Sequence, residues 1–278
     1  MTAITATREL PRSRSVSLLM GSVLLALAPA LIHSVWLEGQ AFAIRLVLLI
    51  AVALAVESLL LRLRGQPVAR QLWDLSAPLS AVLLALVLPT SLPWWMPCLA
   101  IITAIGVAKQ AFGGLGDNPF NPAMAGYALL LVMFPASFQA LFAPTPSLVT
   151  SVLLAAGGAT LLARRIIAWQ APLGFVAGAG CTFLACAAIA GSDAPIGHPS
   201  VPQLLLASFF IVTDPVTGCQ SGRGRALFGI GAGALLVLLG GKGQVADSLP
   251  FAILLMNCAA SWIDEKTRPV PVTARLAG

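Results

Sequence analysis

Charged residues are scarce in this sequence: they make up 9% of its 278 positions, and only ten residues are acidic. A soluble globular domain normally carries about 25% charged residues. Apolar residues make up 58% of the chain, and the mean hydropathy is +0.93. The shortage of charge therefore excludes a soluble globule and predicts an all-α polytopic membrane protein in which residues 1–278 form a single membrane domain.

Histidine and cysteine are also few, with two and five residues. No Cys-x-x-Cys pair or His at zinc spacing occurs, so no metal site is predicted. The cysteines are interpreted as small buried thiols, with an iron–sulfur centre shared with another subunit as the alternative. They are Cys98, Cys181, Cys186, Cys219 and Cys258. No phosphate-binding loop, nucleophile elbow or dinucleotide-binding fingerprint is present, so no nucleotide hydrolase and no catalytic residue is predicted.

Apolar runs bounded by polar residues predict about ten membrane-spanning helices. They lie near residues 16–37, 41–61, 76–89, 94–112, 120–138, 147–163, 171–191, 200–213, 226–241 and 248–264. With a cytoplasmic N-terminus, nearly all Lys and Arg between these runs fall on the cytoplasmic side, and only Lys242 falls outside. This bias predicts cytoplasmic tails at 1–15 and 265–278. It also explains the net charge of +6 without nucleic acid.

The third and eighth predicted spans, Ser76–Pro89 and Ser200–Thr213, are short and end at proline-containing breaks. Each is the third span in a group of five. Matching short segments in two halves are typical of an inverted repeat with a site at the repeat interface. We therefore expect a first repeat near 16–138 and a second near 147–264. Two unrelated short spans in a locally thinned bilayer are the alternative.

The segment Gly113–Ala123 lies between two apolar runs and contains three glycines, two prolines and two asparagines. This composition predicts irregular backbone, which is tolerated at membrane depth only where protein or water surrounds it. Asn118 and Asn121 are expected to cap the fifth span, with Pro122 in its first turn.

Polar groups near the membrane are functional candidates because their burial is costly. Asp214 follows the eighth span and is expected either to cap the next turn and pair with Arg223 or Arg225, or to line a path for an ion or a cofactor. The candidate lining residues are Asn118, Asn121, Thr213, Asp214 and Thr217. Two other charged groups are expected to reach toward the membrane surfaces: Glu57, near Arg62 or Arg64, and Arg45.

Lys109-Gln110 followed by the run from Gly113 to Tyr127 resembles the signature of the D subunit of Rnf-type ion-translocating oxidoreductases. The B subunit of the sodium-pumping NADH:quinone reductase is a relative. Further matching stretches are Pro93–Met96, Phe209–Thr217, Arg223–Gly229 and Ile263–Pro269. The resemblance implies a ten-helix inverted repeat similar to urea transporters, in the bacterial inner membrane. It also implies a non-autonomous subunit of a complex that couples electron transfer between ferredoxin and NAD to sodium or proton movement, with NADH, ferredoxin and iron–sulfur clusters bound by partner subunits.

The family's D subunit typically carries FMN, phosphoester-linked to a threonine in a Ser-x-Ala-Thr-type motif on a long outer loop between the fifth and sixth spans. The corresponding stretch here runs only from Gln139 to Pro146. Thr145 lies on the expected face but between two prolines, and Thr160 lies in an apolar span near the opposite face. We therefore expect covalent FMN to be absent, while a non-covalent flavin between the halves stays open.

Two other functions are compatible with the sequence. One is a channel or carrier of the urea-transporter type, which solute flux through the isolated subunit would reveal. The other is a structural scaffold within the complex, which would tolerate replacement of Asp214 without loss of ion transport.

Overall fold

The computed structural model describes residues 12–139, 147–190, 200–240 and 245–267, and all regular structure in these ranges is helical. The long helices are α1 (Arg12–Glu38), α2 (Gln40–Leu63), α8 (Leu148–Ala163), α9 (Gln170–Ala190), α11 (Gly222–Gly240) and α12 (Val245–Thr267). The shorter ones are α3 (Val68–Leu72), α4 (Ser76–Val87), α5 (Trp95–Thr103), α6 (Pro122–Met133), α7 (Pro135–Gln139) and α10 (Val201–Leu206).

Five segments of the described chain are long and apolar enough to cross a membrane. They are Val16–Glu38, Gln40–Leu63, Trp95–Phe112, Gln170–Ile189 and Gly222–Gly240. Four further apolar helices are shorter: Ser76–Val87, Pro122–Met133, Leu148–Ala163 and Val201–Ile211. These helices confirm an all-helical, multi-pass membrane protein. Which of the shorter helices cross the membrane stays a prediction.

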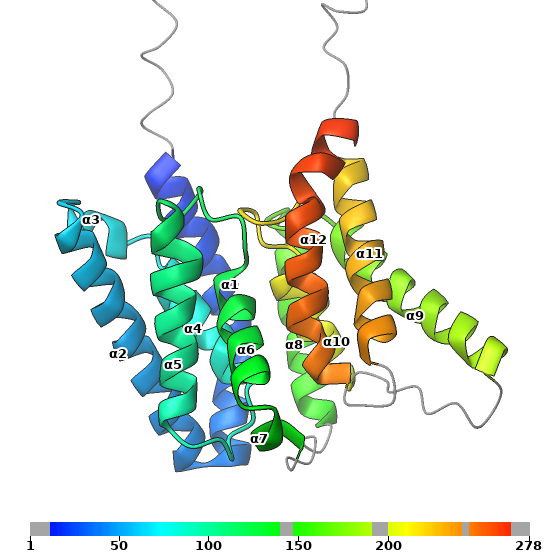
Figure 1. The fold of residues 1–278 in the computed structure, drawn as a ribbon, viewed down its shortest axis with the longest axis horizontal. Coiled ribbons are helices and arrows are strands. Elements are labelled where there is room, and N and C mark those ends of the chain that lie inside the picture. Colours follow the sequence, from blue (N-terminus) through cyan, green and yellow to red (C-terminus); the bar gives the residue numbers. More distant parts are fainter. Residues whose placement is uncertain (1–11, 140–146, 191–199, 241–244, 268–278) are drawn as a thin grey trace, which may run out of the picture.

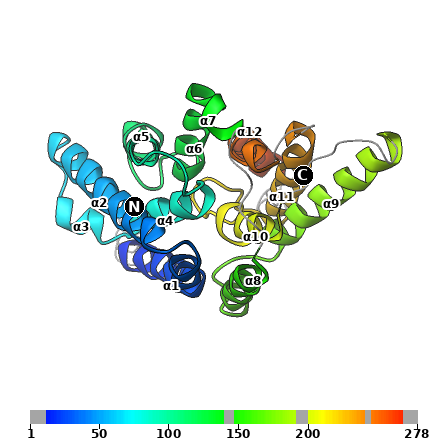
Figure 2. The ribbon, with the colours of Figure 1, turned by 90° about the horizontal axis from the view of Figure 1, so that it is seen from below.

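The helices form two groups that lie side by side (Figures 1 and 2). One group contains α1 to α6, and the other contains α8 to α12. Helix α1 packs on α8 and α6 packs on α12, so these two pairs join the groups. Helix α1 begins and α12 ends at the same end of the bundle, which we call the terminal end (top of Figure 1).

The tightest helix pair is α9 with α11, which meet through two interlocking Gly-x-x-x-Gly patterns. A Cβ atom on Gly174 would lie 2.7 Å from the carbonyl oxygen of Ala226, and one on Gly178 would clash with the backbone of Ile230. Gly229 and Gly233 of α11 face the backbone of α9 in the same way. Without side chains between them the two backbones come into direct contact, which is the main source of helix association in lipid.

Two helices end in π-helical turns that lead into irregular chain. Helix α5 continues into η1 (Ala104–Lys109) and the 3₁₀ turn η2 (Gln110–Phe112), and α10 continues into η3 (Ala207–Ile211). π-Helical turns of this kind are frequent at functional sites. The predicted irregular backbone is confirmed at residues 113–121, where Gly113, Gly114 and Gly116 have φ values of 123°, 108° and 103°. Only glycine adopts such angles without strain.

Helix α6 begins directly after this irregular segment. The side chain of Asn121 accepts a hydrogen bond from the amide of Met124 at 3.2 Å, and Pro122 occupies the first turn, so this cap is confirmed. The expected cap by Asn118 is wrong. Its amide accepts from Gly116 N and donates to Phe120 O, so it closes the loop and makes no bond to the helix.

Candidate functional site: a polar cavity between the helix groups

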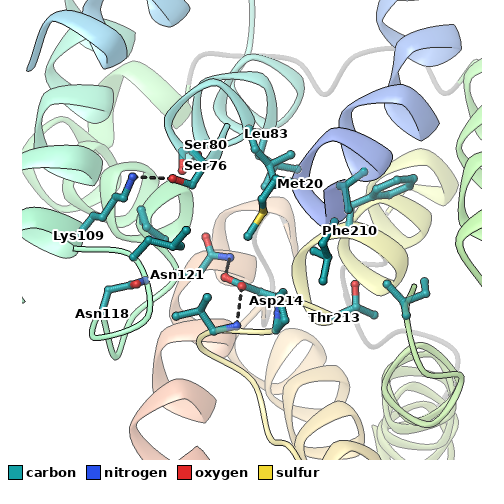
Figure 3. Close-up of a pocket in the computed structure, with 18 of the residues that line it drawn as sticks. Met20, Ser76, Ser80, Leu83, Lys109, Asn118, Asn121, Phe210, Thr213 and Asp214 are labelled. Atoms are coloured by element: carbon teal, nitrogen blue, oxygen red, sulfur yellow. Dashed lines mark hydrogen bonds between the residues drawn. The ribbon is translucent and has the colours of Figure 1, made fainter. Parts of the chain in front are cut away.

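A cavity of about 60 Å³ lies where the two helix groups meet (Figure 3). Its wall combines α1, α4 and the 113–121 segment with η3 and the segment after it. The polar and charged residues on the wall are Ser76, Ser80, Lys109, Asn118, Asn121, Thr213 and Asp214. The volume holds about four waters at roughly 15 Å³ each. This is room for a small hydrated cation.

Asp214 is the acidic residue on this wall. Its carboxylate accepts hydrogen bonds from Asn121 Nδ2 at 3.2 Å, Val216 N at 3.0 Å and Thr217 Oγ1 at 2.9 Å. The expected partners Arg223 and Arg225 are therefore wrong: neutral groups bind this carboxylate. Burial raises the pKa of Asp214, and these hydrogen bonds act in the opposite direction.

Asn257 of α12 joins the two irregular segments. Its Oδ1 accepts from Asn121 N at 3.0 Å, and its Nδ2 donates to Thr217 O at 3.0 Å. Asn257 is buried, and its amide fixes the segment that carries Asp214 against the start of α6. Asn257 is absent from the residues predicted from the sequence, although a lone amide inside an apolar span was a usable signal because buried polar groups must be hydrogen-bonded.

Four of the five predicted lining residues, Asn118, Asn121, Thr213 and Asp214, lie on the cavity wall. Thr213 donates to Phe209 O at 2.6 Å, so its hydroxyl oxygen retains accepting capacity. Thr217 is buried and does not line the cavity. Its hydroxyl supports Asp214 from behind.

A buried ion pair joins Glu57 of α2 to Lys109 at the end of η1, and both side chains are 1% exposed. Lys109 also donates to Ser76 Oγ at 2.6 Å, and Gln110 Nε2 donates to the same Glu57 oxygen at 3.0 Å. The expectation that Glu57 reaches toward the membrane surface near Arg62 or Arg64 is wrong. In apolar surroundings the nearest buried cation compensates the carboxylate, since an unpaired buried charge is far costlier than an exposed one.

Arg64 instead holds the glycine-rich segment. Its guanidinium donates to Gln110 Oε1 at 2.7 Å and to Gly113 O at 3.0 Å. Arg45 does not extend to the membrane surface either: it is buried, donates to Ala85 O at 2.7 Å and lies 5.4 Å over the ring of Phe42. The carbonyl accepts from one guanidinium nitrogen and the aromatic face attracts the cation, while Nε and Nη1 are buried without a hydrogen-bond partner.

The expectation of buried thiols is confirmed for two cysteines and wrong for two others. Cys98 and Cys219 are buried, but Cys181 and Cys258 are exposed on the surface of the chain. Burial raises the pKa of the Cys219 thiol to about 12. Within the described ranges no group of three His, Cys, Asp or Glu side chains could hold a metal ion.

Of the two threonines considered as flavin acceptors, Thr145 lies outside the described residues. Thr160 lies one turn before the end of α8, and its hydroxyl donates to Ala156 O at 2.8 Å.

Comparison with known proteins supplies the family. The model of the NQR2, RnfD, RnfE family matches residues 7–151 and 147–273. The chain is 37% identical to the D subunit of the ion-translocating oxidoreductase complex of Ectopseudomonas mendocina, over 90% of each chain. It is 35% identical to the protein of the same name from Marinobacter nauticus, over 93% of this chain and 91% of the relative. The identity to the Escherichia fergusonii relative is 33%, over 92% and 94%.

Proposed function

This chain belongs to the NQR2, RnfD, RnfE family, and we propose that it is the membrane subunit of an ion-translocating oxidoreductase complex. The observation that carries the proposal is the similarity to subunits of this name over about nine-tenths of both chains. In the proposed complex, electron transfer between ferredoxin and NAD drives sodium or proton movement. Partner subunits bind ferredoxin and NADH, and this subunit, in the bacterial inner membrane with both tails cytoplasmic, provides part of the ion route.

We further propose that the helices form ten crossings arranged as two inverted five-helix repeats similar to urea transporters. Equivalent packing in the two groups supports this arrangement. Helix α1 packs on α4 as α8 packs on α10, and α2 packs on α5 as α9 packs on α11. Helix α5 packs on α6 as α11 packs on α12. Helices α1 and α8 begin at opposite ends of the bundle, as inversion requires (Figure 1).

In this proposal the cavity between the repeats is a station on the ion route. Its wall offers the oxygen atoms of Asn118, Thr213 and Asp214, which are ligands that hard cations prefer. Lys109 lies on the same wall, and its charge is compensated by Glu57. Asp214 is thus the group that can either bind a cation as a carboxylate or take up a proton.

The test uses membrane vesicles that contain the complete complex. The variant Asp214→Asn should retain electron transfer from ferredoxin to NAD and lose most of the coupled uptake of radioactive sodium or of protons. Asp117→Asn serves as the matched control, because Asp117 lies in the same glycine-rich region and does not line the cavity. If Asp214→Asn transports ions normally, the chain is a scaffold. Solute flux through the isolated subunit without electron donors would favour a channel.

We also propose that this subunit lacks covalent FMN. The alignment with the Ectopseudomonas mendocina relative spans 307 positions although this chain has only 278 residues, so that relative carries segments that this chain lacks. The two family matches meet at residues 147–151, directly after the short stretch where the flavin loop is expected.

The intact mass of the subunit, purified within its complex, tests this second proposal. A mass equal to the bare chain supports the loss of the phosphoester. A mass larger by one FMN minus water would overturn the proposal, and peptide mapping would then begin at Thr145.

A further inference from the structure

A second, larger pocket of about 580 Å³ lies beside the polar cavity. Its wall is formed by the turn between α8 and α9, by the segment 212–219 and by the first turns of α11. The α8–α9 turn lies toward the terminal end of the bundle, where positive charge collects in the sequence (Figure 1). The proposed function makes no use of this pocket.

Two arginines give the pocket its charge. Arg165 lies in the α8–α9 turn, and Arg225 lies in the first turn of α11. Between described residues the only ion pair joins Lys109 to Glu57, so neither guanidinium is neutralised by a carboxylate there. Arg225 Nε donates to Cys219 O at 3.2 Å, which leaves its two terminal nitrogens for another acceptor.

Two carboxylates lie near the pocket, and in the described chain neither is within salt-bridge distance of Arg165 or Arg225. Asp214 reaches the wall, but its oxygens accept from Asn121, Val216 and Thr217. Asp264 of α12 accepts from the backbone amides of residues 220 and 221. The N-terminus of α9 also lines the pocket through Gln170 and Ala171. This helix N-terminus adds positive potential beside the two guanidinium groups, so this side of the pocket favours an anion.

The remaining wall is apolar and aromatic. Ile166, Ile167 and Phe228 line it, and Trp169 at its edge is 60% exposed. An exposed indole next to arginines at the ends of membrane helices is typical of the lipid headgroup level. A soluble anion would gain little from these groups, whereas a lipid places its phosphate on the arginines and the start of its chains on the apolar wall.

We propose that this pocket binds the phosphodiester headgroup of an anionic phospholipid with a hydroxyl-bearing headgroup, such as phosphatidylglycerol. The guanidinium groups of Arg165 and Arg225 bind the phosphate, and Trp169 packs on the glycerol backbone. Gln170 Oε1 is buried without a donor, so it offers an acceptor to the headgroup hydroxyl. Basic pockets between membrane helices on the cytoplasmic side bind anionic headgroups in this way.

The test measures lipid binding to the purified complex after delipidation in a neutral detergent. Phosphatidylglycerol is titrated in mixed micelles, bound lipid is counted by native mass spectrometry, and phosphatidylcholine is the reference lipid. Each arginine contributes about fivefold in affinity. Arg165→Gln with Arg225→Gln should therefore weaken phosphatidylglycerol binding about 30-fold, whereas Arg165→Lys with Arg225→Lys should restore most of it.

Arg164→Gln is the matched control, because Arg164 is adjacent and exposed but does not line the pocket. It should bind phosphatidylglycerol like the wild type. If the variant Arg165→Gln with Arg225→Gln binds phosphatidylglycerol as tightly as the wild type, the proposal is overturned. Displacement of the lipid by an equal concentration of inorganic phosphate would overturn it as well, since the pocket would then be a free-anion site. Neither outcome depends on ion transport, so the lipid site can be refuted while the proposed function stands, and the reverse.

Discussion

The burial of the ion pair between Glu57 and Lys109 allows a quantitative prediction of how its removal changes the free energy of unfolding. Both side chains are 1% exposed, and the neutral groups that support them are Ser76 and Gln110. Removing one charge leaves the other in apolar surroundings without compensation. We therefore expect Lys109→Met alone, and Glu57→Gln alone, each to lower the free energy of unfolding by about 3–5 kcal/mol.

The double variant Glu57→Gln with Lys109→Met removes both charges, so no uncompensated ion remains. Replacing a buried ion pair by neutral groups is often close to neutral for stability. We expect the double variant to be more stable than either single variant. The two losses should thus be strongly non-additive, as for groups in direct contact.

The assay heats the purified complex in one detergent to a series of temperatures. At each temperature, size-exclusion chromatography measures how much of this subunit stays in the monodisperse peak. Arg62→Gln is the control, because Arg62 is exposed on the same helix, and it should unfold like the wild type. If the two single losses simply add in the double variant, the pair does not interact energetically. The account of Lys109 as the partner of Glu57 would then be refuted.

Three further predictions concern other parts of the chain. Arg64→Met should speed limited proteolysis after Gly113 by freeing the glycine-rich segment, and unchanged digestion would show that the guanidinium does not hold it. Gly233→Leu should separate α9 from α11 and lower the unfolding temperature strongly, whereas Gly180→Ala, with open space around its Cβ, should not; similar effects would contradict the close helix contact. Burial raises the pKa of the Cys219 thiol to about 12, so at pH 8 Cys219 should react with iodoacetamide about a thousandfold more slowly in the native protein than after unfolding. Mass spectrometry measures the labelled fraction. Fast labelling of the native protein would contradict the burial of this thiol.

The irregular segment between the predicted fourth and fifth spans was visible in the sequence because glycine, proline and asparagine leave few alternatives for the backbone. The cap by Asn121 followed from its place before Pro122, and the structure confirms it. These features are local: each depends on neighbours within a few residues, so composition and spacing carry the information. The two Gly-x-x-x-Gly patterns of α9 and α11 are present in the sequence but were not among the predictions, and only the structure pairs the two helices.

The partners of buried polar groups could not be predicted in this way. Glu57 and Lys109 are separated by 52 positions, and Asn121 and Asp214 by 93. In the sequence, the arginines nearest to Glu57 are Arg62 and Arg64, but both side chains are exposed and lie outside the core. Burial selects partners by distance in space, because an apolar interior tolerates a charge only beside its compensating group.

The sequence by itself therefore determined the class of protein, the positions of its apolar helices and the places where helical structure breaks, among them residues 113–121 and the chain after Thr213. Hydropathy and backbone preference act residue by residue, which is why these were readable. Only the tertiary structure decided that the two breaks meet at one cavity, that Asn257 joins them and that Asp214 is held by neutral groups. Those facts depend on how two groups of helices pack, and packing is a property of the whole chain.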